Sequence, residues 1–297
     1  MPTLSNLIDS TLMYMYGMST HQDQETHITQ DINSTDLTFT VDDATILSKG
    51  LTEIGTELMQ VKSVDTSAGT VTIAPYGRGY RGTTAVSHLS DNRIVAAPLI
   101  PRSFALSAIN ETILSVFPDL YAVGTVTIVS NPVVVTYALP AGALDILSIS
   151  YETIGPSKEW EPIRRWRVDK NADPTKFPSG STVSIYDGIN PGRSIRVVYT
   201  KQPTQLSNLT DDFATVTGLP ESAMDVIRYG SVYRMAPFFD APHLAGQTAE
   251  ADFAANVRPI GSASTFGKYA LQLYQIRLTE ESKKLSSIYP VRSHYTK

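Results

Sequence analysis

The chain contains 297 residues with a formal net charge of −5, and only 18% of its residues are charged. Hydrophobic residues make up 42%, which is too many for a disordered protein and enough to bury a core. Cysteine is absent, which excludes disulfide scaffolds, cysteine-ligated zinc, iron–sulfur clusters and thiol nucleophiles. The acidic balance also lacks the dense basic face that a nucleic-acid groove needs.

The composition favours strands and turns over a helical bundle, because the chain has 32 threonines and 29 serines beside 18 glycines and 18 prolines. Its first residues lack the basic start of a targeting signal. No run approaches the ~18 apolar residues of a membrane span. We therefore expect a soluble protein without a membrane partner.

The first predicted element is a short amphipathic helix. Thr3 or Ser5 can cap its start, and Gly17 can end it. The apolar residues at helical spacing are Leu4, Ile8, Leu12 and Met15. Because this stripe is apolar, the helix must pack on another part of the protein.

From about Thr26 the hydrophobic period changes to two, which is typical of strands. The alternation covers residues 37–41, 58–63 and 94–96, and a turn at 65–69 leads to a return strand at 71–73. Pro98 and Pro101 then break the chain. We expect residues 24–98 to form a small antiparallel β-domain, either a barrel or a sandwich.

A second helix, a second β-region and a helical third follow. Ser103 is predicted to cap the second helix, which ends before Pro118. Strands are predicted at 125–129, 133–137, 146–154, 163–168, 182–186 and 194–199, with a turn at 130–132 and a hairpin turn at 190–192. Helices are predicted from about Pro220 to Pro237, from 244 to 256 and from 264 to 288.

The last of these helices carries two apolar stripes. One consists of Phe266, Tyr269, Leu273 and Ile276, and the other consists of Leu271, Tyr274, Leu278 and Leu285. A helix that is apolar on two faces is either central in its own domain or shared with a neighbouring subunit. We therefore predict the second stripe as a subunit interface.

The predicted fold class is α+β. It has a small N-terminal antiparallel β-domain, a central antiparallel β-region and a C-terminal helical hairpin or bundle with an extended tail. The predicted ranges are 1–23 for the N-terminal helix, 24–98 for a peripheral β-domain and 99–297 for a core domain. Within the core domain we place the β-region at 123–200, the helices at 219–288 and the tail at 289–297.

No catalytic constellation is recognisable. Residues 77–82 match the Gly-x-Gly-x-x-Gly pattern of dinucleotide-binding loops, but that chemistry needs a following helix and an acidic residue about 20 positions on, where Arg102 stands. A loop between strands with two exposed arginines explains the pattern better. The five histidines lack metal-site spacing, and there is no Gly-x-Ser-x-Gly elbow.

Two acid pairs, at 42–43 and 211–212, fit turn and cap chemistry, although a carboxylate pair assembled from distant residues stays open. Residues 160–167 form the densest basic–aromatic cluster, which as a strand would place Arg165 and Arg167 on one face. This cluster is more typical of arginine stacked on tryptophan at a surface or subunit contact than of a nucleic-acid groove. We predict no catalytic residue, no metal and no cofactor.

Three stretches carry a resemblance to a known family. They are the starting helix before the β-domain, the run 57–61 followed by Arg-Gly-x-x-Gly-Thr-x-Ala-x-x-His at 78–88, and the C-terminal pattern between 217 and 290. In these the chain resembles the head–tail connector (adaptor or neck) proteins of tailed bacteriophages, in the larger form with an N-terminal β-domain. An alternative is another tail or baseplate component, or a host-glycan-binding protein of a phage.

The resemblance implies a virion protein of the neck between capsid and tail, present in the host cytoplasm during assembly. It implies a homo-oligomeric ring of about twelve copies with heterologous interfaces beneath the portal protein. Double-stranded DNA would only pass through the channel, and a downstream tail or neck protein would be a further partner. The basic and aromatic tail is then the expected portal-docking element; its residues are Tyr289, Pro290, Arg292, His294, Tyr295 and Lys297.

Overall fold

A computed structural model describes residues 2–17, 23–155, 158–238 and 262–290. The predicted helix at 244–256 and four predicted docking residues lie outside these ranges; the four are Arg292, His294, Tyr295 and Lys297. The chain forms two compact units. Unit 1 consists of Met1–Thr112, Ser207–Asp211 and Asp225–Tyr274, and unit 2 consists of Ile113–Leu206, Asp212–Met224 and Gln275–Lys297.

The α+β fold class is confirmed, with an N-terminal antiparallel sheet, a central β-region and C-terminal helices. The sheet of unit 1 has six strands in the order β1-β6-β3-β4-β5-β2, all antiparallel. Their bounds are β1 Gln24–His27, β2 Thr38–Thr40, β3 Gly50–Ile54, β4 Glu57–Asp65, β5 Thr70–Ile73 and β6 Arg93–Ala96. A bridge between Ile28 and Val41 joins the ends of the two outer strands, so the sheet curves toward a closed barrel.

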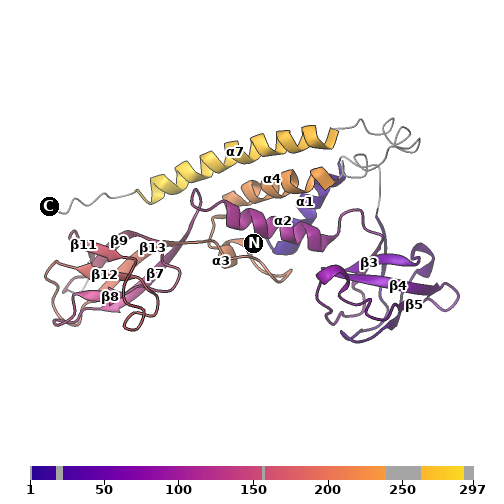
Figure 1. Cartoon of the computed structure of the whole chain (residues 1–297), viewed down its shortest axis with the longest axis horizontal. Helices are drawn as coiled ribbons and strands as arrows, with labels where there is room; N and C mark the ends of the chain where they lie inside the picture. The colour runs from indigo at the N-terminus through magenta and orange to yellow at the C-terminus, as the bar shows by residue number, and fades with distance from the viewer. Residues whose placement is uncertain (1, 18–22, 156–157, 239–261, 291–297) are drawn as a thin grey trace. The chain divides into compact units, whose positions relative to one another are not determined.

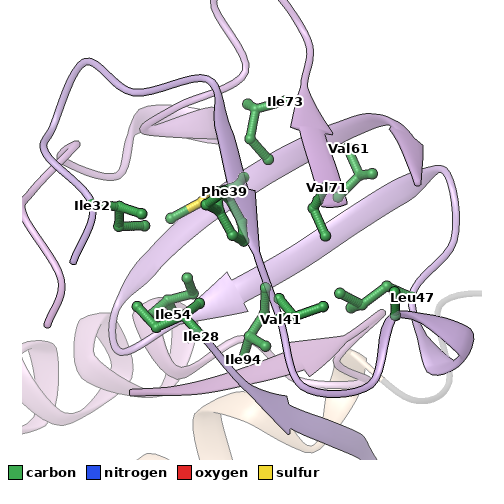
Figure 2. Packing of buried hydrophobic residues seen from close by; sticks show 12 residues of the cluster. Ile28, Ile32, Phe39, Val41, Leu47, Ile54, Val61, Val71, Ile73 and Ile94 are labelled. Carbon is green, nitrogen blue, oxygen red and sulfur yellow. The ribbon is translucent and has the colours of Figure 1, made fainter. Parts of the chain in front are cut away.

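The buried residues that form the core of this β-domain all lie within residues 28–94. Figure 2 shows side chains from different strands, among them Phe39, Val61 and Val71, converging on one interior. Successive strand residues point to opposite faces, so the alternation in the sequence supplies one buried side chain at every second position. A short 3-10 helix, η1 (Ala44–Ile46), is capped by the Asp43 carboxylate, as the acid-pair interpretation predicted.

The helices of unit 1 pack side by side (Figure 1). They are α1 (Leu4–Tyr16), α2 (Arg102–Ser115) up to Thr112, α4 (Met224–Met235) and α7 (Ser262–Ile288) up to Tyr274. The ring of Tyr14 on α1 meets Tyr229 on α4 edge-on, with centroids 5.9 Å apart. Ser231 Oγ on α4 lies 3.5 Å from Thr112 Oγ1 on α2.

The boundaries of two helices test the sequence predictions directly. Thr3 caps α1 and Gly17 ends it, as predicted. The expectation that Ser103 caps the second helix is wrong, because the Pro101 carbonyl accepts the Phe104 and Ala105 amides and α2 already begins at Arg102. Proline fits such a position because its fixed φ suits the start of a helix.

Unit 2 contains two antiparallel sheets that share one core. The four-stranded sheet has the order β10-β9-β13-β7 and the three-stranded sheet has the order β11-β12-β8. The bounds are β7 Ala122–Val129, β8 Thr136–Ala138, β9 Asp145–Glu152, β10 Trp160–Pro162, β11 Trp166–Asp169, β12 Thr182–Ile185 and β13 Ser194–Lys201. Buried Ile149 and Val197 of the first sheet and Val183 of the second belong to the same hydrophobic cluster.

Two β predictions in this region are wrong. The turn at 190–192 connects β12 and β13, which belong to different sheets, so it does not close a hairpin. Of the strand expected at 163–168, only residues 166–168 lie in a strand, β11, because β10 already ends at Pro162. The Asp187 carboxylate accepts the backbone amides of Arg164 and Arg165, which takes these two residues out of strand pairing.

Two short helical pieces precede α4. They are α3 (Phe213–Thr217), which the sequence did not predict, and the 3-10 helix η3 (Glu221–Ala223), which lies within the helix predicted from about Pro220. Asp212 caps α3 through the Thr215 amide at 2.9 Å, which confirms the cap chemistry predicted for this acid pair. Gly218 ends α3 with φ at 74°, a conformation that favours glycine.

Candidate partner-binding surfaces

The glycine-rich loop between β5 and β6 is held by a buried carboxylate. Glu57 accepts Arg78 Nε at 2.7 Å and Nη2 at 3.0 Å, and lies 2.8 Å from His88 Nε2. It also accepts the amides of Gly79 at 3.0 Å and Val86 at 3.1 Å. One side chain on β4 therefore fixes both ends of the Arg-Gly-x-x-Gly-Thr-x-Ala-x-x-His pattern.

Glu57 is charged in the folded protein despite its burial. Its side chain is 0% exposed, and those of Arg78 and His88 are nearly as buried. Burial by itself raises the pKa of Glu57, but the hydrogen bonds from His88, Arg78, Val86 and Gly79 outweigh it and lower that pKa to about 2. The Arg78 guanidinium also donates to the carbonyls of Asn33, Asp36 and Val86, so its donors are used inside the fold.

The loop presents Arg81 and Tyr76 to solvent, and Tyr76 is 98% exposed. The expectation of two exposed arginines is wrong, because Arg78 is the partner of Glu57. Only the three-residue 3-10 helix η2 (Tyr80–Gly82) follows the glycines, so the helix that a dinucleotide site requires is not formed there. Tyr76 and Arg81 have φ of 61° and 55°, which non-glycine residues rarely adopt. The hydrogen bonds of Glu57 therefore hold the loop in a conformation that exposes Tyr76 and Arg81.

A second polar cluster ties the β-domain to the helices within unit 1. The Arg102 amide donates to Glu53 Oε2 at 2.7 Å, and the Arg102 guanidinium pairs with Asp9 and donates to Ser5 Oγ at 3.1 Å. Asp9, Glu53 and Arg102 border a cavity of about 280 Å³. Burial raises the pKa of Glu53 to about 8, against the opposing effect of the Arg102 amide and charge. This cluster joins β3, α1 and the start of α2.

The last helix, α7, exposes one of its two predicted stripes more than the other. Tyr269 is 58% and Ile276 is 55% exposed, both from the first stripe. In the second stripe Leu285 is buried, and Leu271, Tyr274 and Leu278 are half-buried. Tyr274 lies against α4, because a Cβ built on Gly230 would be 3.0 Å from its ring. That the second stripe contacts a neighbouring subunit stays a prediction.

The end of α7 reaches the four-stranded sheet of unit 2. Tyr289 and Pro290, both predicted docking residues, line a pocket of about 320 Å³ together with Trp160 and Arg196. The Arg196 guanidinium lies 4.2 Å from the centre of the Trp160 ring. An arginine stacked on tryptophan was expected in the 160–167 cluster, but this arginine comes from β13, which no spacing in the sequence could indicate.

An exposed apolar loop was also missed. Val129 ends β7 with most of its side chain in solvent, and the next three valines, Val133, Val134 and Val135, are exposed too, with Val133 at 87%. Because three consecutive valines fit a buried strand, the sequence predicted a strand from 133 to 137, whereas β8 begins at Thr136. Clustered exposed valines are typical of a contact surface.

Within the part of the chain that the structure describes, no group of acidic or histidine side chains could hold a metal ion. Among the same residues, the longest apolar stretches of helix are insufficient to cross a lipid bilayer. Residues 83–270 match the family model described as SU10 adaptor protein. No curated protein matches the chain. The matched range covers more than half of the sequence and includes α2, both sheets of unit 2 and α4.

Proposed function

The chain belongs to the SU10 adaptor protein family, and on that premise we propose that it is the head–tail adaptor of a tailed phage, assembled as a ring beneath the portal protein. Membership makes the protein a structural adaptor of the virion, a role without catalysis. The proposal adds the ring, the portal contact and the passage of DNA through the channel. The observation that carries it is the family match, which spans α2 to the first part of α7.

The helices provide a surface for contact between copies. Tyr269 and Ile276 lie two turns apart on α7, and both are more than half exposed. A closed ring needs two different complementary faces on each subunit, and an exposed apolar helix face can supply one of them. The exposed valines around Val133 offer a second apolar surface on unit 2.

The charge of the chain suits a passage for DNA. Its formal net charge is −5, and a channel wall of the same sign as the phosphates does not hold the DNA through ion pairs. Some of the basic residues that could bind DNA phosphates form ion pairs within the fold instead. Arg78 pairs with Glu57, and Arg102 pairs with Asp9.

Mass photometry of the purified full-length chain, with and without purified portal, tests the proposal. We expect a species of about twelve subunits, either alone or on the portal. A trimer that does not bind the portal would contradict the proposed ring, and it would favour the alternative that the protein is a receptor-binding or baseplate component.

A further inference from the structure

The pocket at the end of α7 contains an arginine, Arg196, that forms no ion pair with any of the residues that the structure describes. Arg196 projects from β13, and Ser150 lies opposite it on β9 in the strand register. Trp160 of the edge strand β10 supplies the indole on which the guanidinium stacks at 4.2 Å. Ser148, Tyr289 and Pro290 complete the lining of this 320 Å³ pocket.

The donors of Arg196 have no acceptor within the described chain. Its Nε is buried and makes no hydrogen bond there, and no ion pair joins its guanidinium to a carboxylate of the described residues. The pocket lining includes no acidic residue. Nearby carboxylates are already used, since Glu161 accepts the Tyr151 hydroxyl and Glu152 pairs with Lys158. A buried N–H without a hydrogen-bond partner costs about 1–3 kcal/mol of stability, and a ligand that accepts a hydrogen bond from Arg196 Nε would remove this cost.

We propose that the Arg196–Trp160 pocket binds the carboxylate of a glutamate or aspartate on a peptide segment of another protein. Nε–H and one Nη–H of a guanidinium lie along one edge and match the two oxygens of a carboxylate. Ser148 and Ser150 add hydroxyl donors on the neighbouring strand. Stacking on Trp160 holds the guanidinium plane in place, so little side-chain entropy is lost when the ligand binds.

A peptide carboxylate fits better than the phosphates of a nucleic acid. Binding along a phosphate backbone needs several cations, and Arg196 is the one cationic residue among those that line the pocket. The apolar walls formed by Ile288, Tyr289 and Pro290 suit the methylene groups and backbone that carry a glutamate. The inference goes beyond the proposed adaptor role and does not depend on ring formation.

The test uses the tryptophan beneath Arg196 as a reporter in the full-length protein. The probe is the peptide acetyl-Gly-Ala-Glu-Ala-Gly-amide, and its matched control has glutamine in place of the glutamate. We expect saturable quenching of tryptophan fluorescence by the glutamate peptide and at least about tenfold weaker binding of the glutamine peptide. Trp160→Phe should abolish the quenching, because it removes the reporter but leaves an aromatic ring for stacking.

Arg196→Gln should weaken binding of the glutamate peptide about tenfold or more, whereas Arg167→Gln, which removes an exposed charge from β11, should leave it within about twofold. Circular dichroism checks that each variant is folded, and Arg196→Lys keeps the charge without the two-pronged geometry. Equal binding of the two peptides, or unchanged binding by Arg196→Gln, would overturn the proposal. So would tighter binding of inorganic phosphate or of acetate alone, since the pocket would then be a free-anion site.

Discussion

Glu57 is the residue on which the loop of the β-domain depends most. It is fully buried, and its carboxylate accepts five hydrogen bonds from Arg78, His88, Gly79 and Val86. We expect Glu57→Gln to lower the free energy of unfolding by about 3–5 kcal/mol, because it leaves the buried Arg78 charge unpaired. Calorimetry of the variant measures this, with Glu25→Gln as control, since the Glu25–Arg93 pair is half exposed and contributes at most about 1 kcal/mol.

The lowered pKa of Glu57 also predicts that the free energy of unfolding decreases at acid pH. The folded value is lowered to about 2 from about 4.5, so the unfolded chain binds the proton more tightly. The stabilisation is complete above pH 4.5 and is lost as the pH falls toward 2. Unfolding of the wild type and of Glu57→Gln, compared between these pH values, should show converging stabilities. Parallel curves would mean that Glu57 is not ionised in the folded protein.

Titration of Glu53 should change the free energy of unfolding with pH in the opposite direction to that of Glu57. Because its folded pKa is raised to about 8, the folded protein keeps a proton that the unfolded chain releases near pH 4.5, and stability falls as the pH rises between these values. Glu53→Gln keeps an acceptor for the Arg102 amide and removes the titration. We expect the variant to gain on the order of 4 kcal/mol over the wild type between pH 5 and 8.

Chemical denaturation at several pH values measures this difference. Glu111→Gln is the control, because that carboxylate is mostly exposed, and it should follow the wild type. A constant offset between wild type and Glu53→Gln across this range would contradict the raised pKa.

At the scale of elements, Gly230 allows α4 to approach its neighbours. A Cβ on Gly230 would lie 2.4 Å from Thr112 Cγ2 and 3.0 Å from the Tyr274 ring. Alanine usually stabilises a helix interior by about 0.5–1 kcal/mol relative to glycine. Here we expect Gly230→Ala to destabilise by about 1–3 kcal/mol, because α2 and α7 must move.

The matched control is Gly188→Ala, since nothing lies within 4 Å of the added methyl group there and the φ of Gly188 is not left-handed. Thermal unfolding compares the two variants. Stabilisation by Gly230→Ala would show that the helices of unit 1 have room for the added methyl group.

Local chemistry explains which elements could be predicted from the sequence. Helix α1 was predictable because its cap, its apolar spacing and its terminal glycine all lie within 15 residues of one another. The strand β1 was not, because its residues are mostly polar and it pairs with β6 about 70 positions away. Strand β3 also pairs with β6, which is distant in the sequence, and in this pairing the buried acid Glu53 lies opposite Val95.

The candidate sites follow the same division. The glycine-rich pattern of residues 77–82 was visible, yet its meaning depended on Glu57, which lies 21 positions before Arg78. The stacking of Arg196 on Trp160 joins residues on two strands that are not adjacent in the sheet. Spacing within a single segment carries no information about such pairs, because they depend on strand order.

At the scale of the whole molecule, we expect residues 24–98 to be dispensable for ring formation. The hydrophobic core of this β-domain draws only on residues 28–96, so it folds around its own side chains. Replacing 24–98 by a short glycine–serine linker removes Glu53 but leaves Asp9 as the partner of Arg102. Mass photometry of the deletion protein with portal should still show the ring. A folded deletion protein that no longer assembles would make the β-domain part of the ring.

The tail after α7 is expected to dock on the portal. Its first two residues, Tyr289 and Pro290, are also part of a pocket on unit 2. Tyr289 and Pro290 line the Arg196–Trp160 pocket, and the Tyr289 amide continues the helix through the Leu285 carbonyl at 2.9 Å. Truncation after Pro290 therefore removes the basic and aromatic segment 291–297 and leaves that pocket intact. Truncation after Ile288 removes the pocket wall as well.

We expect both truncated proteins to fold and both to lose portal binding, because tyrosine and arginine are the residue types that most often anchor such contacts. In the full-length chain, Tyr295→Ala together with Tyr289→Ala should weaken binding by about 2–4 kcal/mol if both are anchors. Surface plasmon resonance on immobilised portal measures the affinities, and circular dichroism confirms folding. Loss of binding only after the truncation at Ile288 would assign docking to the pocket wall, and unchanged affinity in both would move it to α1 or the β-regions.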